Sequence, residues 1–134
     1  MIMTFQTLKN PLVYITMILF LTNQMIENWL SFTVPVIHAY LDDLLCMPVI
    51  LGLSTQIIQW IHPLRDLYHL DKKAITIVVL FYSILFEGIL PMVEPSTYTA
   101  DWIDVILYSL GGFTYYNLIS KKVKRDYLAL LYKL

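Results

Sequence analysis

The stretch that decides the expected fold runs from Glu87 to Gly112 and reads EGILPMVEPSTYTADWIDVILYSLGG. A Pro-containing polar loop separates two apolar runs in it. Five residues of the second run recur at intervals of three and four, which places them on one face of a helix: Asp101, Asp104, Tyr108, Gly111 and Tyr115. The pattern predicts two membrane-spanning helices joined by a short loop. Carboxylates at the mouth of such a helix are costly and are therefore candidates for function.

The rest of the chain is similarly apolar. Of its 134 residues, 58% are hydrophobic, which is more than one small core could bury. Four stretches approach the roughly 20 apolar residues that a bilayer-spanning helix needs. We therefore expect an all-α, four-span transmembrane helical bundle, with residues 1–134 as one integral membrane domain. The expected spans are residues 8–27, 43–61, 74–93 and 101–119, and residues 120–134 form a basic cytoplasmic tail.

Lys and Arg residues fall on one side of the predicted membrane. All nine lie near the N-terminus, between the second and third spans, or in the tail: Lys9, Arg65, Lys72, Lys73, Lys121, Lys122, Lys124, Arg125 and Lys133. The positive-inside rule makes that side cytoplasmic. We therefore expect a multi-pass protein of the bacterial inner (cytoplasmic) membrane with both termini in the cytoplasm. The opposite side carries seven acids: Glu27, Asp42, Asp43, Glu87, Glu94, Asp101 and Asp104.

The two halves of the chain share an order of features. Each has a span, an acid near its end, a Pro-containing outer loop, an acid pair and a second span. Glu27 precedes Asp43 by sixteen residues, and Glu87 precedes Asp104 by seventeen. This order predicts two parallel helical-hairpin repeats related by an axis along the membrane normal. The alternative is that the similarity of the halves is coincidental.

The tail combines a basic cluster with apolar positions. Lys121, Lys122, Lys124 and Arg125 follow the last span, and several Leu residues come after them. Such a cluster attracts anionic lipid head groups by about 1 kcal/mol per residue. We expect these four side chains to contact anionic lipid at the cytoplasmic face, with the tail as a short interfacial segment flat on the leaflet. The alternative is a frayed terminus whose charges only set the orientation.

The candidate binding site consists of outward acids and one tyrosine. The expected ligand- or proton-binding residues are Glu27, Asp42, Asp43, Glu87, Asp101, Asp104 and Tyr108. Oxygen ligands without thiols suit hard cations such as Mg²⁺ or Ca²⁺, which makes Asp43, Glu87 and Asp104 the metal candidates. Two alternatives are structural. One member of each Asp pair could only cap its helix, and Glu87 could be a neutral acid hydrogen-bonded to Ser83 or to a backbone carbonyl.

Signatures of catalysis are missing from the sequence. It has no G-x-S-x-G elbow, no H-E-x-x-H pair and no phosphate-binding glycine loop, so we expect neither an enzyme nor a cofactor. The lone Cys46 excludes an intramolecular disulfide. Gly111 and Gly112 lie in mid-span, where small residues let helices approach closely. Pro91 lies near the end of the third span, where it is expected to bend or end the helix.

The stretch DWIDVILYSLGG, with an acid upstream, resembles the signature of VanZ-like membrane proteins. In that family an acid precedes a Pro/Arg loop, and D-x-x-D-[VL]-x-x-N-x-x-G opens the last helices. Glu87, Asp101, Asp104 and Gly111 match this pattern position by position, whereas Tyr108 stands where the family has Asn. No Arg occurs between Pro91 and Asp101. The resemblance implies a role in the bacterial envelope, with glycopeptide resistance as the family's named phenotype.

Over about residues 10–117, the chain is also similar to small Bacteroidetes membrane proteins that often carry the label "magnesium citrate secondary transporter". The blocks that carry this similarity are HAYLDDLLCMP (38–48), FEGILP (86–91) and TYTAD (97–101), continuing to Gly111. The label implies transport. An anion site without Lys or Arg on the outer side would be electrostatically unfavourable, however.

Three classes of function follow from these patterns. The leading hypothesis is recognition of a cationic or polar ligand at the acidic site, in a cell-envelope role. The ligand would be a divalent ion, a proton, or the head group of a lipid or envelope precursor. The alternatives are an ion-coupled secondary transporter and a non-catalytic accessory subunit of a larger membrane complex. The expected partners are anionic lipids, and further copies of the chain or other membrane subunits, but no nucleic acid.

Overall fold

In the computed structural model, residues 5–29, 35–97 and 100–134 are described, and all regular structure among them is helical. The α-helices are α1 (Pro11–Trp29), α2 (Pro35–Ile61), α3 (Lys72–Ile84), α4 (Leu90–Val93), α5 (Trp102–Tyr115) and α6 (Lys121–Tyr132). The α2–α3 connection contains a 3₁₀ turn, η1 (Arg65–Leu67). Two π-helical turns, η2 (Leu85–Ile89) and η3 (Tyr116–Ser120), join α3 to α4 and α5 to α6. The expectation of an all-α chain is confirmed.

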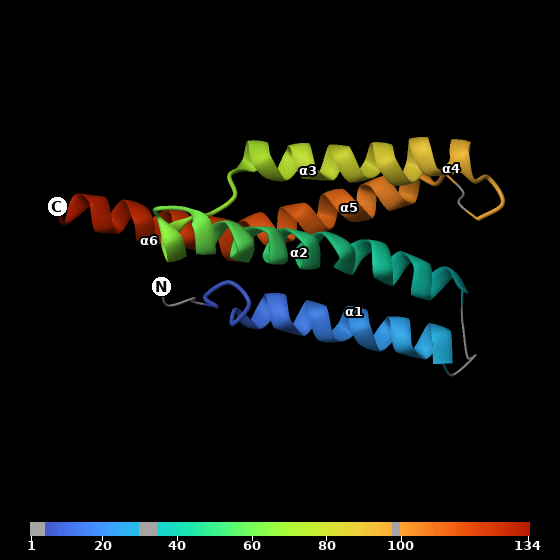
Figure 1. Ribbon diagram of the computed structural model, residues 1–134, viewed down its shortest axis with the longest axis horizontal. Coiled ribbons are helices and arrows are strands. Elements are labelled where there is room, and N and C mark those ends of the chain that lie inside the picture. Colours follow the sequence, from blue (N-terminus) through green and yellow to red (C-terminus); the bar gives the residue numbers. More distant parts are fainter. Residues whose placement is uncertain (1–4, 30–34, 98–99) are drawn as a thin grey trace.

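The helices form an elongated bundle in which α2 and α5 are central and α1 and α3 flank them (Figure 1). Helix α2 packs against α1 and α5, and α3 packs against α5. The last turn of α1, the first turn of α2, α4 and the first turn of α5 lie at one end of the bundle, here called the acidic end (Figure 1). Residues 5–10, the α2–α3 connection and α6 lie at the other, called the basic end.

The predicted second span differs from the helix that the structure contains. Helix α2 begins at Pro35 instead of Asp43. Proline is favoured in the first turn of a helix, where its missing N–H costs nothing. As a consequence Asp42 and Asp43 lie two turns inside α2, and the alternative that one of them caps this helix is wrong. The other three predicted spans coincide with helical segments to within three residues at each end, once the π-helical turns are included.

Two helical segments are long and apolar enough to cross a membrane. They are Ile37–Ile61, and Lys72–Val93, which runs through η2 and α4. Helix α1 ends in polar residues over its last two turns, and α5 alone has 14 residues. The four-span bundle therefore stays a prediction, to which we return below.

Two consecutive glycines on α5 allow close approach on two sides. A Cβ atom at Gly111 would lie 2.8 Å from the backbone oxygen of Leu44 on α2, and one at Gly112 would lie 2.9 Å from Cγ2 of Val79 on α3. The Leu44 oxygen has no helical donor, because Pro48 lacks an N–H. The expected packing role of the glycine pair is confirmed.

A buried polar network closes the basic end. The side-chain oxygen of Gln56 accepts the backbone N–H of Thr7 at 3.0 Å, and that of Gln59 accepts the Thr7 hydroxyl at 2.8 Å. The Gln59 amide also donates to the backbone oxygen of Tyr68 at 3.0 Å. The chain before α1 and the α2–α3 connection are thereby both attached to the last turns of α2.

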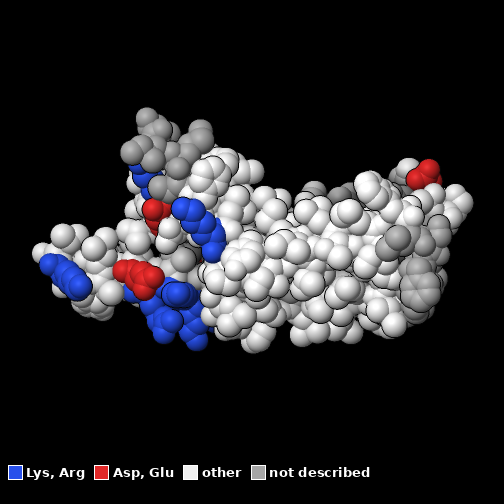
Figure 2. Space-filling view, turned by 90° about the horizontal axis from the view of Figure 1, so that it is seen from below, with Lys and Arg blue, Asp and Glu red and all other residues white. Residues whose placement is uncertain are grey.

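Charge is distributed along the bundle as the sequence predicts. On the face shown in Figure 2, the visible Lys and Arg side chains gather at the basic end, and the long middle of the molecule is uncharged. Helix α6 continues from α5 through η3 along the long axis of the molecule (Figure 1). The tail is thus helical and extends beyond the bundle (Figure 1), and its flat orientation on the leaflet stays a prediction.

Candidate functional site

The site residues at the acidic end come from α2, η2 and α5. Glu87 lies in the middle of the π-helical turn η2. Pro91 accounts for this turn, because it cannot donate an N–H to the carbonyl of Glu87 four residues earlier. Single π-helical turns within α-helices are frequent at functional sites.

Asp101 connects the two helices of the second hairpin. It is the N-cap of α5, and its Oδ1 accepts the backbone N–H of Ile103 at 2.9 Å. Its own backbone N–H donates to Oε2 of Glu87 at 2.5 Å, and its Oδ2 accepts the hydroxyl of Tyr40 at 3.1 Å. The structural alternative, in which one acid of this pair caps the helix, therefore holds for Asp101 and leaves Asp104 without that role.

Three carboxyl groups meet beside this cap. The carboxyl group of Asp104 lies near those of Asp43 on α2 and Glu87 on η2. The hydroxyl of Tyr108, one turn further along α5, donates to Oδ1 of Asp43 at 3.2 Å. Neighbouring carboxylates repel one another, so a proton or a cation lowers the cost of holding them close together. We call Asp43, Glu87 and Asp104 the carboxyl cluster.

A cavity of about 340 Å³ adjoins the carboxyl cluster between η2 and α5. Ser83, Glu87, Asp101 and Trp102 are among its lining residues. The Oγ atom of Ser83 is buried and has no hydrogen-bond partner among the residues that the structure describes. Glu87 instead accepts from a backbone N–H, so the alternative in which it pairs with Ser83 is wrong. The accessible lining of the cavity is almost entirely apolar, and Glu87 and Asp101 are the only acidic residues among the described ones that line it.

Asp42 and Glu27 lie elsewhere. Asp42 faces α1, where its two carboxylate oxygens accept the side-chain amides of Asn23 at 2.6 Å and Gln24 at 2.7 Å. Asn23 also donates to the backbone oxygen of His38 at 3.1 Å, and the two side chains are in contact. Glu27 is exposed on α1. Of the seven expected site residues, the structure therefore brings together five: Asp43, Glu87, Asp101, Asp104 and Tyr108.

Asp43, Glu87 and Asp104, the three candidates for binding a metal ion, do not form a recognisable metal site. In residues 5–29, 35–97 and 100–134, no group of three or more His, Cys, Asp or Glu side chains has an arrangement that could hold a metal ion.

Tyr40 and Asn23 contribute to this end of the molecule but are not among the expected site residues, and Ser83 is expected only as a partner of Glu87. Tyr40 precedes the acid pair by one helical turn or less, and that spacing could have indicated a contact on the same side of α2. Asn23 and Ser83 are polar residues inside apolar runs, which are expected to face other protein groups when they lie within a membrane. Tyr98 and Thr99 of the TYTAD block lie outside the described residues.

No family model matches the chain, and neither a curated protein nor a solved structure matches it.

Proposed function

We propose that the chain is a four-span, VanZ-like protein of the bacterial inner membrane with both termini in the cytoplasm. Supporting this, each of the four helical segments has exposed large apolar side chains, such as Leu21 on α1, Ile57 on α2, Ile84 on α3 and Phe113 on α5. Water-soluble monomers seldom expose apolar surface on this scale. The uncharged middle of the molecule and its basic end fit the same placement (Figure 2).

Within this placement, the carboxyl cluster and its cavity bind a cationic group that arrives from the outer side. The observation that carries the proposal is the convergence of three carboxyl groups beside a cavity, at an end of the bundle to which the sequence contributes no Lys or Arg. Retaining like charges together in an apolar environment is costly unless a proton or a cation compensates them. A bound cation would therefore offset the electrostatic repulsion among the carboxylates of the cluster.

The size of the cavity favours an organic ammonium group over a bare ion. About 340 Å³ exceeds by far the roughly 30 Å³ that one water occupies. Ammonium groups occur on the head groups of membrane lipids and on envelope precursors, so the proposal places the protein in a cell-envelope role.

An ion-coupled secondary transporter is the second candidate function. It is favoured by the position of Asp104 near both Asp43 and Glu87, because carboxyl groups that lie close together can exchange a proton between α2 and η2. In that case proton binding and cation binding would exclude each other at the same carboxyl groups.

The proposal is tested by thermal unfolding of the full chain in nanodiscs of neutral lipid. We expect ethanolamine, as its ammonium ion, to raise the Tm by a few degrees. A ligand at tenfold its Kd stabilises the folded state by about 1.4 kcal/mol. Asp104→Asn should remove the rise, because it removes the central carboxylate. Glu27→Gln is the matched control, because it removes an exposed acid outside the cluster and should leave the rise intact. An equal rise in Asp104→Asn, or none in the unaltered chain at any concentration up to 100 mM, contradicts the proposal.

A further inference from the structure

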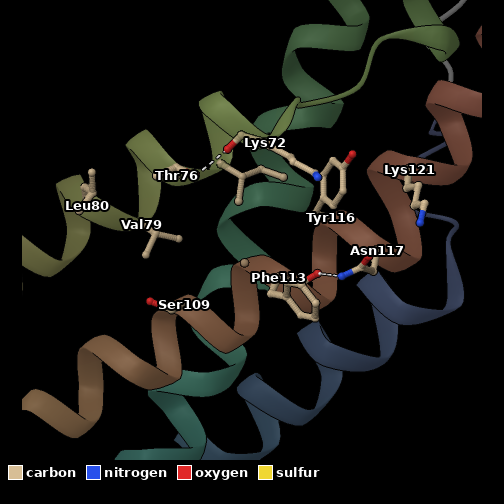
Figure 3. Close-up of a pocket in the computed structure, with 11 residues that line it drawn as sticks. Lys72, Thr76, Val79, Leu80, Ser109, Phe113, Tyr116, Asn117 and Lys121 are labelled. Atoms are coloured by element: carbon tan, nitrogen blue, oxygen red, sulfur yellow. Dashed lines mark hydrogen bonds between the residues drawn. The ribbon is translucent and has the colours of Figure 1, made fainter.

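The basic end of the bundle contains a larger cavity, of about 480 Å³, between α3 and the α5–η3 segment. It is lined by α3 between Lys72 and Leu80 and by the second half of α5, whereas Glu87 follows the end of α3 and Asp104 lies in the first turn of α5. Figure 3 shows that its walls come from α3 on one side, and from α5, η3 and the first residue of α6 on the other. Gly112 forms part of the wall between the two sides and permits the close approach of α3.

The lining of this cavity changes in character along its length. Toward the basic end lie the two ammonium groups of Lys72 and Lys121, together with Tyr116 and Asn117 (Figure 3). The Nζ atom of Lys72 lies 5.3 Å from the centre of the Tyr116 ring. Within the described part of the chain, neither lysine forms an ion pair with a carboxylate. The described residues that line the cavity thus include two lysines and no Asp or Glu.

The remaining length of the cavity is mainly apolar. Val79, Leu80 and Phe113 line it, and Leu80 and Phe113 are also exposed at the surface, 55% and 68% respectively. The cavity is thus bordered by side chains that would face the hydrocarbon of a bilayer. From Lys72 to Leu80, a helix rises about 12 Å at 1.5 Å per residue. This is close to the roughly 15 Å of one leaflet, half of the 30 Å hydrocarbon core.

We propose that this cavity is a binding site for an anionic phospholipid of the cytoplasmic leaflet. The phosphate lies between Lys72 and Lys121, and an acyl chain follows α3 past Val79 toward Phe113. The charge of the two lysines selects an anionic head group over a zwitterionic one, and the apolar length selects a lipid over a free phosphate compound. The site requires that α3 crosses the bilayer, but it does not depend on the carboxyl cluster.

The experiment uses the full chain in nanodiscs of phosphatidylcholine with a small fraction of photoactivatable phosphatidylglycerol. Cross-links should map to peptides that contain residues 72–80 and 109–121. Lys72→Gln and Lys121→Gln should each lower the preference for phosphatidylglycerol over phosphatidylcholine about fivefold, the effect of one charge near an anionic head group. Lys122→Gln and Lys124→Gln are the matched controls. They remove the same charge from the same basic cluster but do not line the cavity, and they should change the preference less than twofold.

A second variant tests the apolar part. Thr76→Trp fills the cavity from an exposed position on α3, and it should reduce cross-linking of phosphatidylglycerol and phosphatidylcholine alike while leaving the Tm within a few degrees.

Three results would overturn the proposal. Equal effects of the cavity lysines and the control lysines would show attraction by the whole basic surface. Competition by millimolar inorganic phosphate would show a phosphate site, and cross-links on α1 would place the lipid elsewhere. Loss of ethanolamine binding in Asp104→Asn, with lipid cross-linking unchanged, would separate this site from the proposed function.

Discussion

The two helical hairpins, α1–α2 and α3–α5, carry acids in the same order but surround them with different groups. In the first, Asp42 is bound by the neutral amides of Asn23 and Gln24. In the second, Glu87 accepts only a backbone N–H and otherwise meets the carboxyl group of Asp104. The two amide donors satisfy the hydrogen-bonding capacity of the Asp42 carboxylate. A carboxylate beside another carboxyl group needs a proton or a cation to offset the repulsion between them. The partner groups, and not the acids, distinguish a structural contact from a candidate site.

Asp43 lies in one hairpin and contacts the other. It belongs to the first hairpin, yet its side chain meets Tyr108 and Asp104 of the second. Neighbouring residues of a helix point about 100° apart, so Asp42 and Asp43 serve different hairpins. The repeat predicted from the sequence is present as an order of features, but its two acid pairs have different surroundings.

The largest loss of stability is expected for a substitution at the contact between α2 of the first hairpin and α5 of the second. Gly111→Ala would place a Cβ atom 2.8 Å from the Leu44 backbone oxygen, which cannot rotate away as a side chain could. We expect this substitution to lower the free energy of unfolding by about 2–3 kcal/mol. Gly88→Ala is the matched control, because no atom lies within 4 Å of its added Cβ, and it should be neutral or stabilising by up to about 1 kcal/mol. Denaturant or thermal unfolding measures both, and equal stability of the two variants would contradict the close α2–α5 contact.

An intermediate loss of stability is expected when the hydrogen bonds of Asp42 in the first hairpin are removed. Asn23→Ala removes the donors to Asp42 and to the His38 carbonyl and leaves both acceptors partly unsatisfied. The expected loss of stability is about 1–2 kcal/mol. Asn28→Ala, whose amide bonds only to the Gln24 backbone oxygen one turn earlier, should cost less than about 0.5 kcal/mol. A harmless Asn23→Ala would mean that Asp42 is no better satisfied than the acids of the second hairpin.

The smallest effect on stability is expected at Glu87. Glu87→Gln keeps an oxygen that accepts the Asp101 N–H but removes a negative charge from the carboxyl cluster. The free energy of unfolding at pH 7 should therefore stay within about 0.5 kcal/mol of the original value or rise, while the Tm rise with ethanolamine is lost. Unfolding of this variant would show that ionised Glu87 holds the bundle together through another group. Unchanged stability together with an unchanged Tm rise would show that ethanolamine binds without the Glu87 carboxylate, which contradicts its place in the binding site.

Hydrophobic runs and spacing predicted much of this architecture. They located the helices, because a helix in an apolar setting must satisfy its backbone internally and is long and apolar in sequence. The spacing of Asp101, Asp104 and Tyr108 correctly predicted a shared face and a helix cap. Both are local properties that depend on residues within two turns of one another.

Other features could not be predicted, because they depend on how helices rotate against one another. Which of Asp42 and Asp43 faces α1 is decided by the packing of α2 between α1 and α5. The network of Gln56 and Gln59 joins residues about 50 positions apart. The cavity beside Lys72 and Lys121 depends on a contact between α3 and α5 that the sequence pattern does not specify.

The continuity of α5 with α6 has a mechanical consequence. From Trp102 to Tyr132 the chain is helical throughout, including η3, and 31 residues at 1.5 Å span about 46 Å. That length exceeds the roughly 30 Å of a bilayer's hydrocarbon core. A helix of this kind acts as a lever: a force that tilts α6 displaces the opposite end, where Asp101 and Asp104 lie, in the reverse direction. The bend permitted at η3 sets how much of the displacement is transmitted.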